Sequence, residues 1–418
     1  MGLGTAAAGI RESAHSSIRR YFDLAADRLR LHPEMRRLLS VPFRELTVEL
    51  PLRRDDDRLQ LFRGYRVQHN GVRGPVLGPV RFQSGLEIET LRAEAESMTW
   101  LSAVAGVPFG GAAGGVACDP EQLSRKEFER LVRRYTARVH HVLGVYHDVC
   151  ASGVNAGSEA MLWMAEEYSA LQKDTVPAVL GKPAERGGLP EADKIVGRAI
   201  AALVLRAAQD KEISPSGLCV AVQSLDRSAF YTALALLEAG CIVVAISEER
   251  GTLYCSSGID MQSLATHLRD TGALAGFEGA AEAGDIHTID CDALVLAAPE
   301  CTLNAAAANR VRARMVLETS ALVITPEAEH SLATRDVLVV PDLVAAAAPV
   351  LAANAEWTHN VQRLSPVQDK LEREIAIALL HSYEQIRERS QRDKISLRIG
   401  AYCAAIDRAA RSERLRVA

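Results

Sequence analysis

Aromatic side chains and cysteine-based motifs are scarce in this sequence. Phe, Trp and Tyr make up 5% of the 418 residues, and the eight cysteines include no Cys-x-x-Cys pair. This pattern argues against a structural zinc site or a redox dithiol. Most cysteines lie in apolar stretches such as Leu218-Cys219-Val220, where a reduced thiol packs as a small hydrophobe. We therefore expect no metal and a reducing, cytoplasmic location.

Strong net charge and long apolar runs are missing as well. The formal net charge is -5, so no basic field favours nucleic acid or an anionic membrane surface. The longest apolar stretch, residues 343–355, is too short to span a bilayer and contains Pro349. The N-terminus shows no signal-peptide pattern, and Ala6 stands where myristoylation needs Ser or Thr. The sequence predicts a cytoplasmic protein without nucleic-acid or membrane partners.

A glycine-rich stretch is the most unusual segment of the chain. Residues 110–115 read Gly-Gly-Ala-Ala-Gly-Gly and directly follow Val107-Pro108-Phe109. Paired glycines let the backbone turn tightly and approach a ligand closely. The stretch contains no acid, base, nucleophile or metal ligand. We therefore expect an active-site loop that lacks its reactive side chain.

Hydrophobic patterning in the first half of the chain predicts helices around a strand pair. Residues 9–39 have helical periodicity, and residues 45–52 and 59–67 alternate like the two strands of a hairpin. Further helices are expected at 87–103 and from a capping box at Ser124 and Glu127 onward.

The second half of the chain predicts a parallel sheet. Residues 218–223, 229–238 and 241–246 read as strand, helix and strand, which is one βαβ unit. Continuous apolar runs at 292–297, 315–317 and 337–340 are typical of further buried parallel strands. Long helices are expected at 365–389 and 396–411, and the breaker-rich segment 181–188 is typical of a domain boundary.

Several segments together resemble the glutamate dehydrogenase family over nearly the whole chain. They include Gly74-Pro75, Met98-Thr99-Trp100, the glycine stretch 108–115 and Glu356-Trp357. The resemblance implies an α/β fold with two domains. Residues 1–183 plus 358–418 would form an α/β substrate and oligomerisation domain, and residues 184–357 a Rossmann-like doubly wound domain. The family usually forms hexamers and places catalysis in the cleft between the domains.

The positions that carry chemistry in this family differ here. Leu77 and Leu101 stand where the motifs hold lysines that bind substrate carboxylates, Ala113 replaces the catalytic lysine, Gly153 an aspartate and Ala353 a substrate serine. A charge-assisted hydrogen bond contributes about 1.5–3 kcal/mol. A positioned acid or base contributes about 10²–10⁴-fold in rate. The resemblance therefore implies that no catalytic residue remains.

The nucleotide-binding positions are degenerate too. The family's Gly-x-Gly-x-x-Gly reads Ser224-Leu225-Asp226-Arg227-Ser228-Ala229, so Ser224, Asp226 and Ala229 replace all three glycines. Asp226 would place a carboxylate where the phosphates belong. Glu248 keeps an acid where ribose hydroxyls would bind, and the family's loop at 346–350 reads Ala-Ala-Ala-Pro-Val. We expect no cofactor, with NAD(P) bound only if the degenerate site still functions.

These features are similar to the regulatory subunits known in some bacterial glutamate dehydrogenases. The resemblance implies an inactive subunit that pairs with a catalytic paralogue in a hetero- or homo-hexamer and responds to an amino acid such as leucine. Two alternatives stay open. The chain could be an active dehydrogenase whose site is rebuilt from Arg66, Arg73, Arg81 or Lys182. It could also be a stand-alone small-molecule sensor or structural protein that uses the old cleft.

Overall fold

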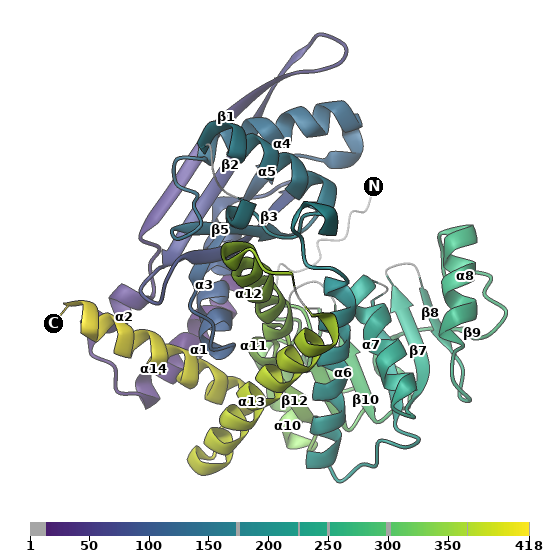
Figure 1. The fold of residues 1–418 in the computed structure, drawn as a ribbon. Helices are drawn as coiled ribbons and strands as arrows, with labels where there is room; N and C mark the ends of the chain where they lie inside the picture. The colour runs from purple at the N-terminus through teal and green to yellow at the C-terminus, as the bar shows by residue number, and fades with distance from the viewer. Residues whose placement is uncertain are drawn as a thin grey trace, which may run out of the picture.

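Two sheets, each covered by helices, organise the chain (Figure 1). The computed structural model describes residues 14–172, 176–224, 226–248, 251–297, 302–365 and 367–417. The first sheet has the strand order β1-β2-β4-β3-β5, and the second has the order β12-β11-β10-β6-β7-β8-β9. This arrangement confirms the predicted α/β class with a doubly wound second sheet, in which the neighbours β12, β11, β10, β6 and β7 are parallel.

The predicted N-terminal helices and hairpin are present. Their bounds are α1 (Ala14–Arg28), α2 (Pro33–Leu39), β1 (Arg44–Arg53) and β2 (Leu59–Asn70). The two strands pair antiparallel, with Val48 opposite Gly64. In the sheet order β1 is an edge strand, with β2 as its neighbour.

The glycine stretch is a strand in the middle of the first sheet, so the expected loop is wrong. The elements around it are β3 (Val76–Gln83), α3 (Ile88–Val104), β4 (Gly110–Ala117) and β5 (Asp148–Ser152). A Cβ at Gly111 would lie 2.2 Å from the Ala95 oxygen, and one at Gly110 would lie 1.7 Å from the Asn70 oxygen. The glycines therefore serve close packing of backbone on backbone, which explains them without a ligand.

Two helices cover the face of the first sheet that is opposite α3. They are α4 (Arg125–Val139) and α5 (Ser158–Gln172). The predicted capping box is confirmed, because Ser124 Oγ accepts from the Glu127 N–H and Glu127 Oε2 accepts from the Ser124 N–H at 2.8 Å. Leu131 of α4 and Met161 of α5 belong to one buried cluster with Val80 and Phe82 of β3.

The second sheet contains the predicted βαβ unit. Its bounds, with the preceding helix, are α6 (Ala192–Asp210), β6 (Cys219–Gln223), α7 (Arg227–Glu238) and β7 (Ile242–Glu248). The other predicted strands are confirmed as parallel, at β10 (Ala293–Leu296), β11 (Met315–Glu318) and β12 (Leu338–Val340). An antiparallel extension that the sequence reading missed consists of β8 (Gly251–Tyr254), α8 (Met261–Thr271) and β9 (Ala281–Ala283).

Helices complete the chain, and one of them replaces an expected loop. Their bounds are α9 (Ala305–Ala308), α10 (Pro326–Thr334), α11 (Asp342–Ala345), α12 (Ala347–Gln362), α13 (Gln368–Asp393) and α14 (Leu397–Val417). Residues 346–350, expected as a loop, join α11 to α12. Alanine is the best helix former, and Pro349 lies in the first turn of α12, where its missing N–H costs no hydrogen bond.

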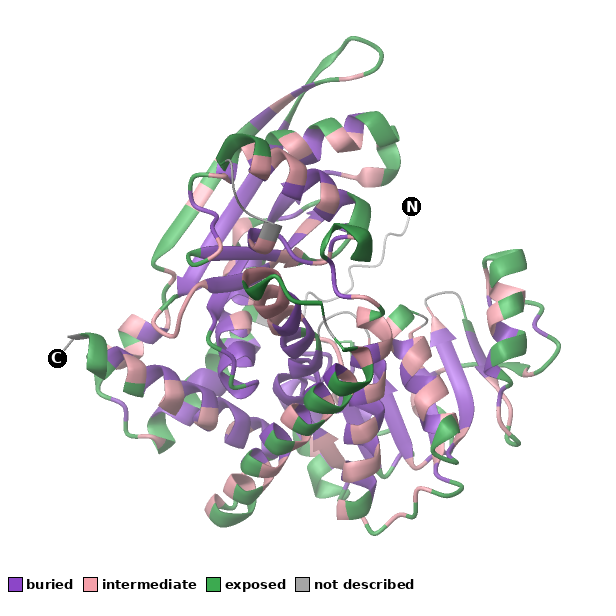
Figure 2. Cartoon of the chain, in the orientation of Figure 1, coloured by how far each residue is buried: buried purple, intermediate pink, exposed green. Residues whose placement is uncertain are grey.

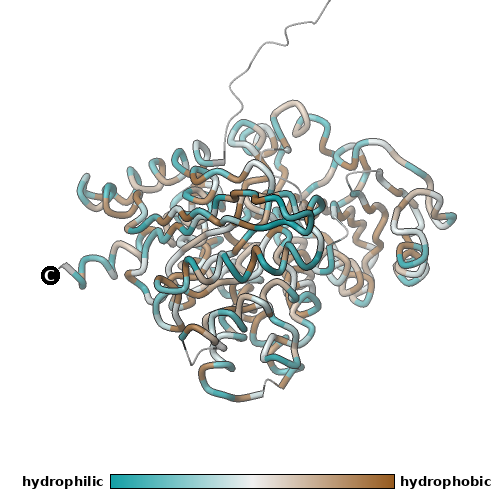
Figure 3. Tube along the Cα trace, turned by 90° about the horizontal axis from the view of Figure 1, so that it is seen from above, coloured by the Kyte–Doolittle hydropathy of each residue, from teal (hydrophilic) through white to brown (hydrophobic). Residues whose placement is uncertain are grey.

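Burial follows these layers. Figure 2 shows buried residues along both sheets and exposed residues at the tip of the β1–β2 hairpin. In Figure 3 hydrophilic stretches lie across the centre of the view as well as at its edges, and alternate with hydrophobic ones along the chain. In Figure 1, α14 lies beside α1 and α13 beside α6, so the C-terminal helices adjoin both halves of the chain. The boundaries near residues 183 and 357 stay a prediction.

Within the described parts of the chain, no helix has the length and apolar character needed to cross a bilayer. The seven described cysteines are unpaired, and Cys301 lies outside the described residues.

Candidate functional site

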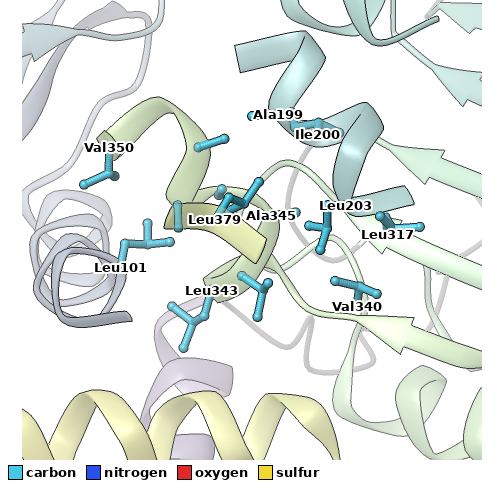
Figure 4. Packing of buried hydrophobic residues seen from close by; sticks show 14 of the residues in the cluster. Leu101, Ala199, Ile200, Leu203, Leu317, Val340, Leu343, Ala345, Val350 and Leu379 are labelled. Carbon is cyan, nitrogen blue, oxygen red and sulfur yellow. The ribbon is translucent and has the colours of Figure 1, made fainter. Parts of the chain in front are cut away.

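The candidate site is the region where α3 and the first sheet face the helices of the second half. Figure 4 shows Leu101 of α3 in the same side-chain cluster as Leu343 and Val350, which come from α11 and α12. Leu101 is buried there, with 7% of its surface exposed. The side chain at position 101 thus takes part in an apolar contact between α3 and the helices α11 and α12.

Leu77 and Ala113 lie on the face of the first sheet that α3 covers. Leu77 is opposite Gly111 in the β3–β4 ladder, and paired residues point to the same side of a sheet. Ala113 follows Gly111 by two positions and shares that side. Both residues are fully buried, and Ala113 packs with Tyr65 and Val67. The structure therefore brings Leu77, Leu101 and Ala113 to one side of the sheet, in apolar surroundings.

Gly153 and Ala353 are placed differently. A side chain at 153 would meet the Val80 oxygen at 2.6 Å and the Pro79 Cβ at 2.9 Å, so Pro79 restricts this position further. Ala353 lies on α12 and packs against the main buried cluster. That cluster also contains Leu77 and Leu101.

The cationic residues that might rebuild a site have internal partners. Arg66 and Asp148 form a buried pair, in which Arg66 Nε lies 3.0 Å from Asp148 Oδ2. Arg81 pairs with Glu94 at 2.8 Å.

The other two candidates are engaged in the same way. Lys182 Nζ lies 3.2 Å from Glu356 Oε1, and burial lowers the pKa of Lys182. Arg73 Nη2 donates to the Val107 oxygen at 2.8 Å. All four cations thus hold elements of the fold together.

The degenerate nucleotide loop caps its own helix. Asp226 Oδ1 accepts a hydrogen bond of 2.8 Å from the Ala229 N–H at the start of α7. Ser224 has a φ of 122°, a region that favours glycine, and its hydroxyl lies 2.9 Å from Asp226 Oδ2. The carboxylate therefore lies at the helix end that would attract a phosphate. Leu225 lies outside the described residues.

Glu248 ends β7 and pairs with Gly251 of β8 in an antiparallel hairpin. The predicted acid is therefore at the carboxyl end of the second parallel strand. Residues 249 and 250 lie outside the described residues.

Replacing Asp226 with alanine is expected to lower the free energy of unfolding by about 1 kcal/mol, because α7 loses its N-cap. Urea denaturation of the whole chain measures this change. Asp226→Asn keeps a capping oxygen and should change the free energy of unfolding by less than about 0.5 kcal/mol. Equal stability of all three proteins would show that Asp226 does not cap the helix.

A buried charge cluster connects α14 and α1 to the elements β11, α10 and α11. The sequence analysis did not predict it. Arg398 of α14 is fully buried and contacts Glu318 of β11, Glu329 of α10 at 2.5 Å and Asp342 of α11 at 2.8 Å. Tyr21 of α1 donates to Glu329 at 2.9 Å. Burial raises the pKa of Glu318 to about 7. No local sequence pattern signals this cluster, because the partners of Arg398 lie 56 to 80 positions away.

Metal binding has no support from geometry in the described ranges. There, no group of three or more His, Cys, Asp or Glu side chains is arranged to hold a metal ion.

Comparison with known proteins identifies similar chains over almost the full length. Residues 42–170 match the family described as Glu/Leu/Phe/Val dehydrogenase, dimerisation domain, and residues 187–416 match Glutamate/Leucine/Phenylalanine/Valine dehydrogenase. The glutamate dehydrogenase of Thermotoga maritima is 34% identical over 393 residues, which cover 93% of this chain and 94% of the relative.

Two solved structures are similar in fold. The hetero-hexameric glutamate dehydrogenase from Thermus thermophilus, in a Leu-bound form, has a TM-score of 0.91 and 32% identity, covering 97% of this chain and 98% of that one. Glutamate dehydrogenase from Peptoniphilus asaccharolyticus has a TM-score of 0.85 and 24% identity, covering 97% and 99%.

Proposed function

The chain belongs to the Glu/Leu/Phe/Val dehydrogenase family. We propose that it is a catalytically inactive, cytoplasmic regulatory subunit of a hetero-oligomeric glutamate dehydrogenase. One observation supports the proposal. Leu77, Leu101 and Ala113, which the sequence resemblance places at the family's lysine positions, are buried in apolar surroundings. None of these side chains can bind a carboxylate or carry a proton.

The alternative of a rebuilt active site has less support. The nearby cations already pair with Asp148, Glu94, Glu356 or a backbone carbonyl. Recruiting Arg66 or Lys182 to a substrate would leave the buried carboxylate of Asp148 or Glu356 without its partner, which costs several kcal/mol.

Assembly with a catalytic paralogue has support from the first sheet. β1 is an edge strand, and Phe43, Leu59 and Leu61 beside it are large apolar residues that are more than half exposed. The first sheet lies in the segment that matches a dimerisation domain. The Thermus thermophilus relative is hetero-hexameric and has leucine bound, which favours a paralogue as partner and leucine as effector. An inactive subunit acts on an active one only through a shared two-state element.

Val48→Pro is expected to abolish co-assembly and effector response together, because proline removes a backbone donor and interrupts the edge strand. Size-exclusion chromatography of the chain with its catalytic paralogue measures assembly, and the paralogue's rate with and without leucine measures the response. Val48→Thr keeps the strand geometry and serves as the control. If Val48→Pro is folded by circular dichroism and still gives a leucine-responsive complex, the assembly surface lies elsewhere.

NADH and NADPH are expected to bind more weakly than about 1 mM, which corresponds to a free energy of about -4 kcal/mol. The reason is that Asp226 holds the end of α7 with its own carboxylate. Isothermal titration calorimetry on the purified chain measures the affinity, with the Thermotoga maritima enzyme as a positive control. Micromolar binding would mean that this chain holds the pyrophosphate by another route.

A further inference from the structure

A cavity of about 420 Å³ lies outside the candidate site, between the start of α1, the segment from α2 to β1, and α3. Its volume is within the range of small-molecule pockets. The apolar residues Val41 and Pro42 and the charged residues Glu45 and Arg92 are among its lining residues. His69 and Glu96 also line it, although both are almost completely buried, with 2% and 3% of their surfaces exposed.

His69 presents an acceptor nitrogen without a partner. Its Nδ1 lies 2.8 Å from Thr99 Oγ1, and that hydroxyl donates to the Ala95 oxygen at 3.2 Å. In the tautomer whose Nδ1–H donates to the Thr99 hydroxyl, Nε2 carries no proton and is an acceptor, and an ammonium ligand would select this tautomer. Burial lowers the pKa of His69 to about 3, so the ring is neutral. Nε2 is buried and has no hydrogen-bond partner.

Glu96 presents a second free acceptor. Its Oε1 accepts from Trp100 Nε1 at 3.3 Å, and in the described residues Oε2 makes no hydrogen bond. The Trp100 ring also contacts the His69 ring, with centroids 5.9 Å apart, so both acceptors lie around one indole. Burial raises the pKa of Glu96 to about 7.

The lining is short of hydrogen-bond donors and carries excess negative charge. Arg92 is occupied by Glu45, with both contacts at 2.6 Å, and by Glu89. Three acidic side chains, Glu45, Glu89 and Glu96, thus line the cavity with one guanidinium, that of Arg92, and Arg19 also acts on Glu96. Buried acceptors without donors are costly, and a ligand that supplies N–H groups and positive charge satisfies them.

We propose that this cavity binds a small primary ammonium compound, with the ammonium group between His69 Nε2 and Glu96 and an apolar body along Val41 and Pro42. Leucine and 3-methylbutylamine have this chemistry, whereas 4-methylpentanoate has the same apolar body without the ammonium group. The role of this cavity as an effector site rests on the proposed regulatory function. The binding of an ammonium compound in the cavity does not depend on that function.

Isothermal titration of the full chain tests the proposal with these three compounds. Leucine and 3-methylbutylamine are expected to bind, with 3-methylbutylamine the tighter because the leucine carboxylate meets an acidic lining, and 4-methylpentanoate is expected not to bind. Glu96→Gln keeps the side-chain volume and the acceptor for Trp100 but removes the charge, and should weaken binding at least tenfold. Val41→Trp fills the cavity without altering a buried polar group and should weaken binding equally. Glu121→Gln, an exposed acid in another part of the chain, is the matched control.

Unchanged binding in both cavity variants, equal binding of 4-methylpentanoate, or no binding of the amines at 10 mM would overturn the site. A leucine-dependent change in the partner's rate that survives in both variants would overturn the cavity as the effector site and leave the regulatory function intact. Binding that is lost in both variants, with no effect of the wild-type chain on any partner's rate, would support the site and count against the regulatory function.

Discussion

Replacing Arg398 with methionine is expected to lower the free energy of unfolding by about 3–5 kcal/mol, because it leaves buried charges uncompensated. Arg398 is fully buried and faces Glu318, Glu329 and Asp342, which belong to three different elements of the second half. Methionine fills much of the same volume, so the loss reports charge rather than a cavity. Urea denaturation at pH 8 measures it.

The same experiment has an internal control and a pH dependence. Arg411→Met, on the same helix, removes an exposed i,i+4 pair with Asp407 and should cost less than about 0.5 kcal/mol. Glu318 has a pKa of about 7 in the folded protein, above its usual 4.5, so it binds a proton on folding between these values. The Arg398→Met loss should therefore shrink at pH 5, where Glu318 is neutral. A loss below about 1 kcal/mol at pH 8 would contradict the interpretation.

Purified alone, the chain is expected to oxidise glutamate with a kcat/KM at least about a hundredfold below that of the Thermotoga maritima enzyme, because no acid or base stands at the family positions. Leu77 and Leu101 also lack the charge that would hold the substrate carboxylates. Steady-state assays with NAD and with NADP, at matched protein concentration, measure the rate. A rate within a hundredfold would refute inactivity.

Ala113→Lys should not restore activity. Ala113 is fully buried beside Tyr65 and Val67, so a lysine there would place an ammonium group in an apolar cluster. Positions 77, 101 and 153 would still carry leucine, leucine and glycine in place of charged partners, and the effects of residues that act as a unit are not additive. Recovery by the single substitution would show that the remaining site is intact.

Sequence reasoning succeeded where local patterns determine structure. The strands β6, β7 and β10 are buried on both faces and read as continuous apolar runs, and Ser124 with Glu127 specifies a helix start within four residues. It failed at β4, because glycine and alanine have low strand propensity and the strand is held by its neighbours. It failed at 346–350 because a family loop was carried over onto alanines that form helix.

The sequence predicted which residues belong to the candidate site, but not the apolar surroundings in which they lie. The resemblance located Leu77, Leu101 and Ala113, but not that α3 and the second half bury them. The capping role of Asp226 follows from its place before a helix. The Arg398 cluster and the His69 cavity depend on contacts between distant segments, which a single sequence does not encode locally.

The close contact between Gly111 of β4 and the backbone of α3 should couple the movements of these two elements. A Cβ at Gly111 would lie 2.3 Å from the Thr99 nitrogen and 2.2 Å from the Ala95 oxygen, so the strand backbone rests directly on the helix backbone. Compliant side chains do not separate the two elements there, and their amide protons should exchange with solvent in one shared opening event. We therefore expect the first sheet and α3 to move as one unit, which extends from the edge strand β1 to Leu101.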